Sequence, residues 1–456
     1  MIHTSYKSHA DAIGKMTNGK KILFATVPAD GHVNPLSGIA VYLQSIGYDV
    51  RWYTSELYKE KINRLNIPHY PFVKALDIRG DNINELLPER AKHKNMVSKL
   101  NFDIIHFFIK RSTEYFDDIK QIYKTFPFDL MIADCCFTAI PFVKEKMDIP
   151  VISIGIVALT ESSKDLPPAG LGMTPSYSVA GLIKQNILRW FAHNVLFAKS
   201  TKVLKALTKE HNLSYNDEDI FDYLVKKTTL LLQSGTPSFE YFRGDMGRNI
   251  EFAGPMLPYT PPKKQAPWFD ERLNKYNNVI LLTQGTVEKD TEKLIVPTLE
   301  AFKDADVLVV VTTGGSRTEE LRKRYPQQNI IIEDFIPFSD VMPYADVYVS
   351  NGGYGGVLLA IENELPCVVA GVHEGKNEIC ARIGYFNLGI NLKTETPKPM
   401  QIKKSVEEIL TNHAYKENVK SLALEFSMYN ANEICAKHVK ELIEAKEMEY
   451  ADERVY

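Results

Sequence analysis

The sequence lacks any apolar run near the ~20 residues that a helix needs to cross a bilayer, and residues 1–20 lack the apolar centre of a secretory signal. It also lacks a charge bias, since 54 Lys and Arg stand against 57 Asp and Glu, which gives no general attraction to nucleic acid or anionic membranes. Its five cysteines include no C-x-x-C spacing, and Cys and His do not cluster at metal-ligand spacing. We therefore expect a soluble, cytoplasmic protein with reduced thiols, no bound metal, no nucleic-acid partner and no stable membrane insertion; its oligomeric state stays open.

What the sequence does have is a repeated alternation of strands and helices. The runs KILFATVP, DVRWYT, DLMIAD, PVISIG and TTLLLQS are short and β-branched, and the stretches between them can hold crossover helices. A proline-rich stretch interrupts this pattern, which then resumes with NVILLTQG, VLVVVTT, NIIIEDF, VYVSNGG and PCVVAG. The pattern predicts a disordered tail over 1–20, an α/β domain over 21–252, a linker over 253–267, a second α/β domain over 268–420, and over 421–456 a C-terminal helix that packs back toward the first domain and ends in a polar tail.

Two polar residues follow strands of the first domain. His32 lies in the loop Gly31–Pro35, ahead of a helix expected to begin at Pro35, and an imidazole with a pKa of ~6.5 suits proton transfer near neutrality. Asp134 ends the strand DLMIAD and could orient His32, as the carboxylate of a catalytic triad orients its histidine. His32 could equally be a helix cap without chemistry, and from the sequence alone Asp134 is more simply explained as a cap of the turn over residues 135–137. If they are functional, they lie at the carboxyl ends of strands, where open α/β sheets bind ligands.

Two glycine-containing turns follow strands of the second domain. Ser350–Gly356 precedes an apolar helical stretch, and such a turn lets a backbone approach a phosphate while the helix N-terminus supplies unpaired N–H groups. Thr283–Thr286 has the same character after another strand. One such turn alone could be an ordinary tight turn, but two in one domain favour anion binding.

These motifs, GHVNP and then FIPFSDVMPYADVYVSNGGYGGVLLAIENELPCVVAGVHEGKNEICARIGYFNLGINL, resemble the family 1 nucleotide-sugar glycosyltransferases, whose fold, GT-B, has two Rossmann-like parallel-sheet domains that face each other across a cleft. The resemblance extends from Lys21 to about Leu392. It implies that His32 is the catalytic base and Asp134 its partner. It also implies a donor site that holds a UDP- or dTDP-sugar as co-substrate, without a further cofactor, through Thr283, Gly285, Thr286, Phe335, Ile336, Asn351, Gly352, Gly353, Gly355, Gly356 and Glu374.

The chain departs from the family pattern at four donor-side positions. Asn351 stands where the family usually has His, Gly356 where it has Ser or Thr, Gly375 where Gln is common and Leu359 where many members have a ribose-binding Glu. An amide can donate a hydrogen bond but carries no positive charge. The sugar and the nucleotide of the donor therefore stay open.

The first domain contains many apolar side chains that could contact an apolar acceptor such as a flavonoid, terpenoid or macrolide. We select Phe102, Phe107, Phe137, Leu166, Leu171 and Trp190, although each could be plain core. The basic, amphipathic stretch 183–209 is interpreted as a helical flap over the acceptor pocket in preference to a segment lying on a membrane. Together these features predict an inverting, metal-independent hexosyltransferase, with a GT-B-like sugar-nucleotide epimerase and a non-catalytic nucleotide-sugar-binding protein as alternatives.

Overall fold

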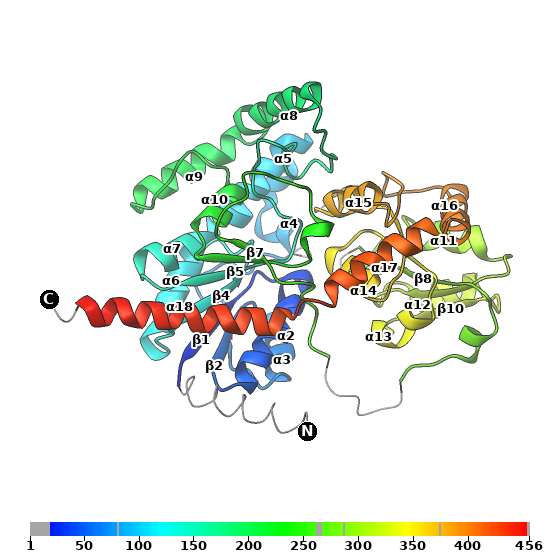
Figure 1. The fold of residues 1–456 in the computed structure, drawn as a ribbon, viewed down its shortest axis with the longest axis horizontal. Coiled ribbons are helices and arrows are strands. Elements are labelled where there is room, and N and C mark those ends of the chain that lie inside the picture. The colour runs from blue at the N-terminus through cyan, green and yellow to red at the C-terminus, as the bar shows by residue number, and fades with distance from the viewer. Residues whose placement is uncertain (1–18, 80–81, 261–266, 286–287, 374, 454–456) are drawn as a thin grey trace.

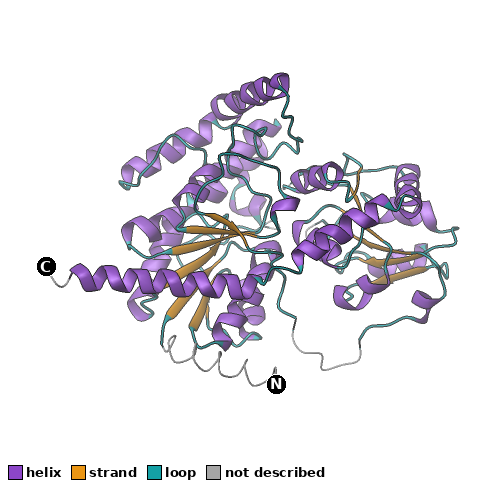
Figure 2. Cartoon of the chain, viewed as in Figure 1, coloured by secondary structure: helices purple, strands orange, loops and turns teal. Residues whose placement is uncertain are grey.

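Two parallel β-sheets, one in each half of the chain, organise the protein (Figures 1 and 2). The computed structural model describes residues 19–79, 82–260, 267–285, 288–373 and 375–453. The strand order is β3-β2-β1-β4-β5-β6-β7 in the first sheet and β10-β9-β8-β11-β12-β13 in the second, and neighbouring strands are parallel throughout. In each sheet the order reverses beside the strand that comes first in the chain, as in Rossmann-like folds. The fold class predicted from the sequence is confirmed.

The strands and helices have the following bounds. The strands are β1 (Lys21–Ala25), β2 (Asp49–Tyr53), β3 (His69–Tyr70), β4 (Leu130–Asp134), β5 (Val151–Gly155), β6 (Leu230–Gln233), β7 (Ile250–Phe252), β8 (Val279–Thr283), β9 (Leu308–Thr312), β10 (Ile330–Glu333), β11 (Val347–Ser350), β12 (Cys367–Val369) and β13 (Gly389–Asn391). The α-helices are α2 (Asp30–Ser45), α3 (Lys59–Asn63), α4 (Ile83–Leu86), α5 (Met96–Asp103), α6 (Arg111–Thr125), α7 (Ile140–Lys146), α8 (Val179–Phe191), α9 (Ala198–Glu210), α10 (Ile220–Lys227), α11 (Ile295–Phe302), α12 (Thr318–Arg324), α13 (Phe338–Val341), α14 (Tyr354–Glu362), α15 (Lys376–Tyr385), α16 (Pro399–Thr411), α17 (Ala414–Phe426) and α18 (Ala431–Glu453). None of the described helices combines the length and apolarity that crossing a membrane demands.

Helices cover both faces of each sheet, which explains why the central strands are apolar without alternation (Figure 2). All five residues of β4, β5, β8 and β9 are buried. The strands therefore formed where the sequence has continuous β-branched runs, and each predicted run contains an observed strand.

The first long helix begins earlier than predicted. α2 starts at Asp30, so Pro35 lies inside the helix, and His32 is part of its first turn. Asp30 places a carboxylate near the positive end of the helix dipole, which favours the earlier start. The histidine is consequently held by helical backbone and not by a loop.

The chain crosses between its two halves twice, and the two crossings touch. After β7, Ala253 is fully buried, and Gly254 pairs with Gly235 in an isolated β-bridge. Residues 261–266, in the middle of the predicted linker, lie outside the described residues, as does the predicted tail up to residue 18. The return crossing lies between α17 and α18, where Tyr429 contacts Gly254 so closely that a β-carbon at the glycine would overlap it.

The C-terminal segment divides between the two halves of the protein. Leu422 and Phe426 of α17 pack into the hydrophobic cluster of the second sheet, whereas Cys435, Val439 and Ile443 of α18 pack onto the first sheet. α18 runs along the first sheet beside α2 (Figure 1). The crossing thus follows Phe426, several residues beyond the boundary predicted at 420/421, because α17 buries its apolar face in the second cluster.

Candidate active site

The carboxyl ends of the central strands define one potential site in each sheet. The strand order reverses between β1 and β4 in the first sheet and between β8 and β11 in the second. Open α/β sheets bind ligands at such switch points. His32 follows β1 and Asp134 ends β4, whereas Thr283 ends β8 and Asn351 follows β11. The predicted catalytic pair therefore lies at one switch point, and the predicted phosphate turns lie at the other.

His32 and Asp134 are in direct contact. His32 Nδ1 lies 2.9 Å from Asp134 Oδ1, and the fully buried carboxylate also accepts hydrogen bonds from the backbone N–H groups of Val27 and Cys136, both at 2.8 Å. Because both carboxylate oxygens act as acceptors, Nδ1 must carry the proton, and Nε2 keeps its lone pair. The imidazole is 20% exposed, so it remains accessible to a substrate.

The surroundings of His32 pull its pKa in two directions. Burial of the ring by itself lowers the pKa, but the charge of Asp134 and its hydrogen bond to the ring outweigh burial, so the pKa of His32 is raised above its usual 6.5. The carboxylate therefore fixes the tautomer of the imidazole and increases its affinity for a proton. Both effects suit a general base that forms an imidazolium during the reaction.

The same corner of the protein offers a possible ligand set for a metal ion. Atoms of His32, Asp134 and Cys136 that could bind a metal lie within 4.8 Å of one another. In the observed arrangement three N–H donors occupy the Asp134 oxygens, and His32 Nδ1 is one of them. A metal would have to displace these hydrogen bonds, so the arrangement fits an acid–base pair better than a metal site.

At the second switch point, the glycine turn leads into the N-terminus of α14. Gly352 has a φ of +79°, and a β-carbon there would overlap the Cys380 thiol. At Gly356 a β-carbon would lie 2.6 Å from the hydroxyl of Tyr348, so both positions require glycine for packing. A β-carbon at Gly355 would meet no atom within 4 Å. The open surface at Gly355, together with the unpaired N–H groups of the first helical turn, suits an approaching phosphate.

The turn after β8 is tied to the glycine turn. The Asn351 side-chain amide donates to the backbone carbonyl of Gln284, and Thr283 Oγ1 accepts a hydrogen bond from the N–H of Gly285 at 3.2 Å. Gly285 has a φ of +74°. The side chain that replaces the family histidine thus joins the two turns. Gly353 is the N-cap of α14, and the predicted donor residues Thr286 and Glu374 lie outside the described residues.

The neighbouring strand end holds residues that the sequence analysis missed. Phe335, predicted to bind the donor, is 69% exposed, whereas Ile336 is 5% exposed and packs in the core of the second domain. Beside Phe335 lies the turn 313–316 after β9, where a β-carbon at Gly315 would contact the Phe335 ring at 4.0 Å. In this turn Ser316 Oγ is buried and has no hydrogen-bond partner among the described residues. Gly314 and Gly315 follow the apolar strand β9 as Gly285 follows β8, so the same sequence signal could have identified this turn.

The two switch points face each other across the interdomain contact. Helix α2, which carries His32, contacts helix α14, which begins at the glycine turn. Tyr354, in the first turn of α14, donates a hydrogen bond to the backbone carbonyl of Ser234 in the first domain and stacks on Phe239 with a ring separation of 6.4 Å. The imidazole and the predicted phosphate turn therefore lie on facing sides of one interface.

Three of the predicted acceptor residues are buried. Phe137 is fully buried among Tyr53 and Tyr115, so it has no exposed surface for an acceptor, and we assign it to the core. Phe102 stacks on His106 at a ring separation of 4.1 Å and is 8% exposed, and Leu166 is 5% exposed. The sequence could not distinguish these residues from wall residues because both kinds are apolar and aromatic.

The other three predicted acceptor residues retain exposed surface. Phe107 is half-buried against Phe108, Leu171 is 42% exposed and Trp190, on α8, is 63% exposed. None of the six predicted acceptor residues lines either of the two cavities described below.

The loop around Leu171 is held by the second domain. The backbone N–H groups of Gly170 and Gly172 both donate to Glu378 Oε1 at 2.8 Å. The other oxygen of Glu378 pairs at 3.0 Å with Arg382, which also pairs with the buried Glu240 of the first domain. Helix α15 of the second domain thus fixes the loop beside the predicted acceptor region.

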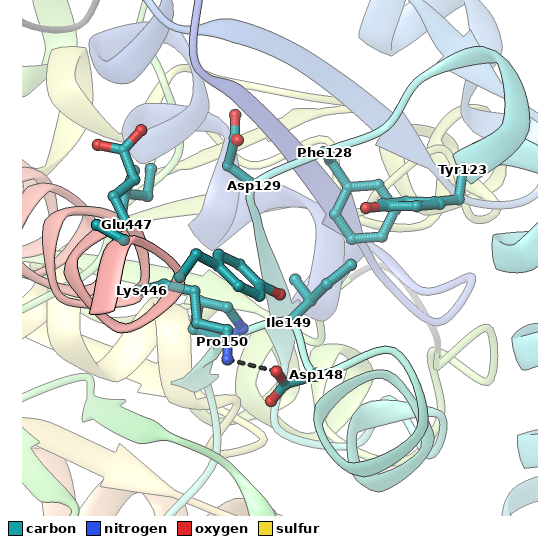
Figure 3. A pocket seen from close by; sticks show the side chains of 11 residues that line it. Tyr123, Phe128, Asp129, Asp148, Ile149, Pro150, Lys446 and Glu447 are labelled. Atoms are coloured by element: carbon teal, nitrogen blue, oxygen red, sulfur yellow. Dashed lines mark hydrogen bonds and ion pairs between the residues drawn. The ribbon is translucent and has the colours of Figure 1, made fainter. Parts of the chain in front are cut away.

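Two cavities lie outside the two switch points. The larger, of about 380 Å³, lies between α18 and the amino ends of β4 and β5, where Asp129 and Pro150 precede the strands and Lys446 pairs with Asp148 (Figure 3). It is therefore at the opposite end of the sheet from His32. The second, of about 260 Å³, has acidic residues such as Asp219 in its wall. Neither cavity is lined by His32.

Comparison with known proteins gives the family. Residues 297–442 match the model of the erythromycin biosynthesis protein CIII-like C-terminal domain. The chain is 32% identical over 414 residues to 4'-demethylrebeccamycin synthase of Lentzea aerocolonigenes, covering 91% of this chain and 97% of that protein. It is 30% identical over 443 residues to UDP-glucosyltransferase 1 of Beauveria bassiana (strain ARSEF 2860), covering 92% and 94%.

The fold has close counterparts among solved structures. The glycotransferase of kitacinnamycin superimposes with a TM-score of 0.73 at 15% identity, covering 93% of this chain and all of that one. Two relatives at 30% identity or more span over nine tenths of the chain, and the facing switch points match the resemblance of the motifs. The chain belongs to the family 1 nucleotide-sugar glycosyltransferases of GT-B fold.

Proposed function

We propose that the protein is an inverting hexosyltransferase that moves a sugar from a UDP- or dTDP-sugar to a hydroxyl group of a small, apolar acceptor. The observation that carries the proposal is the contact of His32 with Asp134 at one switch point, opposite the glycine turn of α14 at the other. The name of the Beauveria relative favours UDP-glucose as the donor to try first.

The reaction is a single displacement. His32 Nε2 accepts the proton of the acceptor hydroxyl while the oxygen attacks the anomeric carbon. The bond between that carbon and the β-phosphate oxygen breaks, and the nucleotide diphosphate leaves with the electron pair. Asp134 holds Nδ1–H and stabilises the imidazolium that forms. Because one displacement occurs, the configuration at the anomeric carbon inverts.

The leaving group gains negative charge as the bond breaks. In this proposal the backbone N–H groups from Gly352 to Gly356 and the N-terminal end of the α14 dipole stabilise that charge. No metal ion takes part. The proposal expects full activity after treatment with EDTA, and loss of activity that returns with Mg²⁺ would overturn this part of it.

The acceptor site is assigned to the first domain, beside the loop that carries Leu171. This loop lies within reach of the interface because Gly170 and Gly172 bond to Glu378 of the second domain. Flavonoid, terpenoid and macrolide-like alcohols are the acceptor classes to test.

The deciding experiment is a mass-spectrometric screen of such acceptors with UDP-glucose and dTDP-rhamnose, using the wild-type protein and His32→Ala. A general base contributes about 10²–10⁴-fold to a rate, so the variant should lose transfer by that factor while still binding the donor. Transfer at the wild-type rate by His32→Ala would remove His32 from the mechanism. Incubation with donor alone identifies an epimerase, because an epimerase converts the donor sugar. The acceptor screen identifies a binding protein, because such a protein binds the donor but leaves every acceptor unmodified.

A further inference from the structure

Helix α8 is attached to the protein by polar side chains, while its most exposed positions are apolar. Its side toward the protein presents polar groups: Gln185 is 3% exposed, accepts from the N–H of Ser176 at 2.6 Å and donates to the carbonyl of Asp165 at 2.8 Å, and Arg189 donates to the carbonyl of Leu166. Surface helices of globular proteins normally bury their apolar stripe and expose their polar one. Here the polar side chains anchor the helix.

The apolar stripe of α8 faces outward. Val179, Ile183, Ile187 and Trp190 follow the spacing of one helical face, and they are 77%, 57%, 60% and 63% exposed. Val195, in the π-helical segment Ala192–Leu196 that follows, is 48% exposed. At 1.5 Å per residue the stripe from Val179 to Trp190 is about 16 Å long. A stripe of this length fits an extended surface.

Charge distinguishes among extended surfaces. Residues 179–210 contain six Lys and Arg but one acidic residue, Glu210, in a chain whose net charge is −3. Lys184, Lys199, Lys202 and Lys209 are exposed and form no ion pair with any residue that the structure describes, whereas Lys205 lies 3.6 Å from Asp217. Two copies of the chain that met through this segment would bring like charges together, which disfavours self-association.

We propose that the outward face of α8, together with the lysines of α8 and α9, is a docking surface for an anionic lipid bilayer. We call this surface the α8–α9 rim; it comprises Val179, Ile183, Ile187, Trp190, Lys184, Lys199, Lys202 and Lys209. The apolar stripe enters the boundary between headgroups and acyl chains, and the lysines contact lipid phosphates. Helices α8 and α9, which carry the rim, form one edge of the molecule in Figure 1.

The rim is connected to the loop beside the interface. Gln185 and Arg189 bond to the backbone of residues 165, 166 and 176, and the same loop bonds through Gly170 and Gly172 to Glu378. Docking would therefore hold that loop close to the bilayer, from which an apolar molecule could enter. The docking itself does not depend on the proposed reaction and can be measured without it.

The test is flotation of the full-length protein with vesicles of phosphatidylcholine alone or with about one third phosphatidylglycerol. The fluorescence of Trp190 should shift to the blue with the anionic vesicles only, and Trp190→Phe identifies the signal against Trp52 and Trp268. We expect Ile187→Ser/Trp190→Ser to reduce partitioning at least tenfold. Lys199→Glu/Lys202→Glu should reduce it similarly, and raised salt should weaken wild-type binding.

Matched controls use equally exposed residues elsewhere. Leu424→Ser, at a position 62% exposed on α17, and Lys404→Glu, at an exposed lysine of α16, should leave partitioning unchanged. Equal binding to neutral and anionic vesicles, or no binding, would overturn the proposal. So would a dimer that Trp190→Ser dissociates without any binding to vesicles, which would identify a second copy as the occupant, or an effect of the rim variants confined to the KM of a water-soluble acceptor.

Discussion

Replacing Asp134 by Asn tests the acid–base pair with almost no change of shape. The carboxylate accepts three hydrogen bonds, from Val27 N, Cys136 N and His32 Nδ1. An amide has one accepting oxygen and one NH₂ group. If the oxygen faces His32, the NH₂ group points at the N–H of Val27. If the oxygen faces Val27, the NH₂ group points at Cys136 N and at His32, which must then accept through Nδ1 and carry its proton on Nε2. That tautomer cannot act as the base.

The expected losses of stability and of rate follow from the hydrogen bonds that the amide cannot accept. Either orientation leaves a buried N–H group against another donor, which costs about 1–3 kcal/mol of stability. The rate of transfer should fall by about 10²–10⁴-fold, which is the usual contribution of a general base. The wild-type kcat/KM should rise with pH through the pKa of His32, which Asp134 holds above 6.5. In the variant this rise of kcat/KM should occur at lower pH, because the carboxylate that raised the pKa of His32 is gone.

Stability should depend on pH in the corresponding sense. A histidine whose pKa is raised on folding stabilises the protein fully below its unfolded pKa, and this contribution disappears as the pH rises through the folded pKa. The Tm difference between wild type and Asp134→Asn should therefore shrink as the pH increases through that range.

The assay pairs initial rates at several pH values with thermal unfolding, and Asp129→Asn is the matched control. Asp129 accepts a hydrogen bond from the N–H of Lys21 at 2.7 Å, at the opposite end of the same sheet. Its replacement should lower stability but leave kcat/KM and the pH at which kcat/KM rises unchanged. An Asp134→Asn enzyme with the wild-type rate and pH profile would refute the reasoning.

Three further changes probe the second domain and the interface. Gly352→Ala should lower Tm, because Gly352 has a positive φ and a β-carbon there would overlap Cys380, at a cost of about 1–3 kcal/mol. Gly355→Ala should leave Tm unchanged or raise it, because Gly355 has a helical backbone and open space around it. Equal Tm values for the two variants would contradict this. Arg382→Ala should lower the free energy of unfolding by about 3–5 kcal/mol in denaturant titrations, because it leaves Glu240 and Glu378 without their shared partner. Replacement of the exposed Arg322 by Ala should lower it by only about 0–1 kcal/mol. Similar losses for both variants would show that burial of the Arg382 pairs does not increase their contribution to stability. Tyr354→Phe removes the hydrogen bond to Ser234 and should cost about 1 kcal/mol with a several-fold loss in kcat/KM, while an unchanged kcat/KM would show that this contact does not hold the interface for catalysis.

The sequence predicted the sheets because their strands are buried on both faces. Runs such as DLMIAD and NVILLTQG are apolar without alternation, which is the pattern of central parallel strands, and β4 and β8 lie within them. The same logic located His32 and Asp134 at strand ends. Their contact, at 2.9 Å over 102 positions of sequence, could not be deduced from spacing, because it depends on β1 and β4 being neighbours.

The predictions that differ from the structure concern side-chain direction. Phe137 is predicted to contact the acceptor because it is aromatic, and this character is the same in a core as in a pocket wall. Ile336, which the family resemblance assigns to the donor site, packs in the core of the second domain. The sequence of 183–209 predicts a flap with its apolar face toward a pocket, whereas in the structure the stripe of α8 is exposed. Gln185 turns the polar side of α8 toward the protein by bonding to the backbone of residues 165 and 176. These partners leave no signal in the local periodicity of the sequence.

The contact between Gly254 and Tyr429 links the two crossings between the domains. The first crossing begins at Gly254, and the return crossing contacts this glycine through Tyr429. The bridge between Gly254 and Gly235 ties the same point to the segment after β6, next to Ser234, which accepts the hydrogen bond of Tyr354 from α14. A larger side chain at position 254 would therefore press on Tyr429 and disturb the way the two domains meet, although it would touch neither His32 nor the glycine turn.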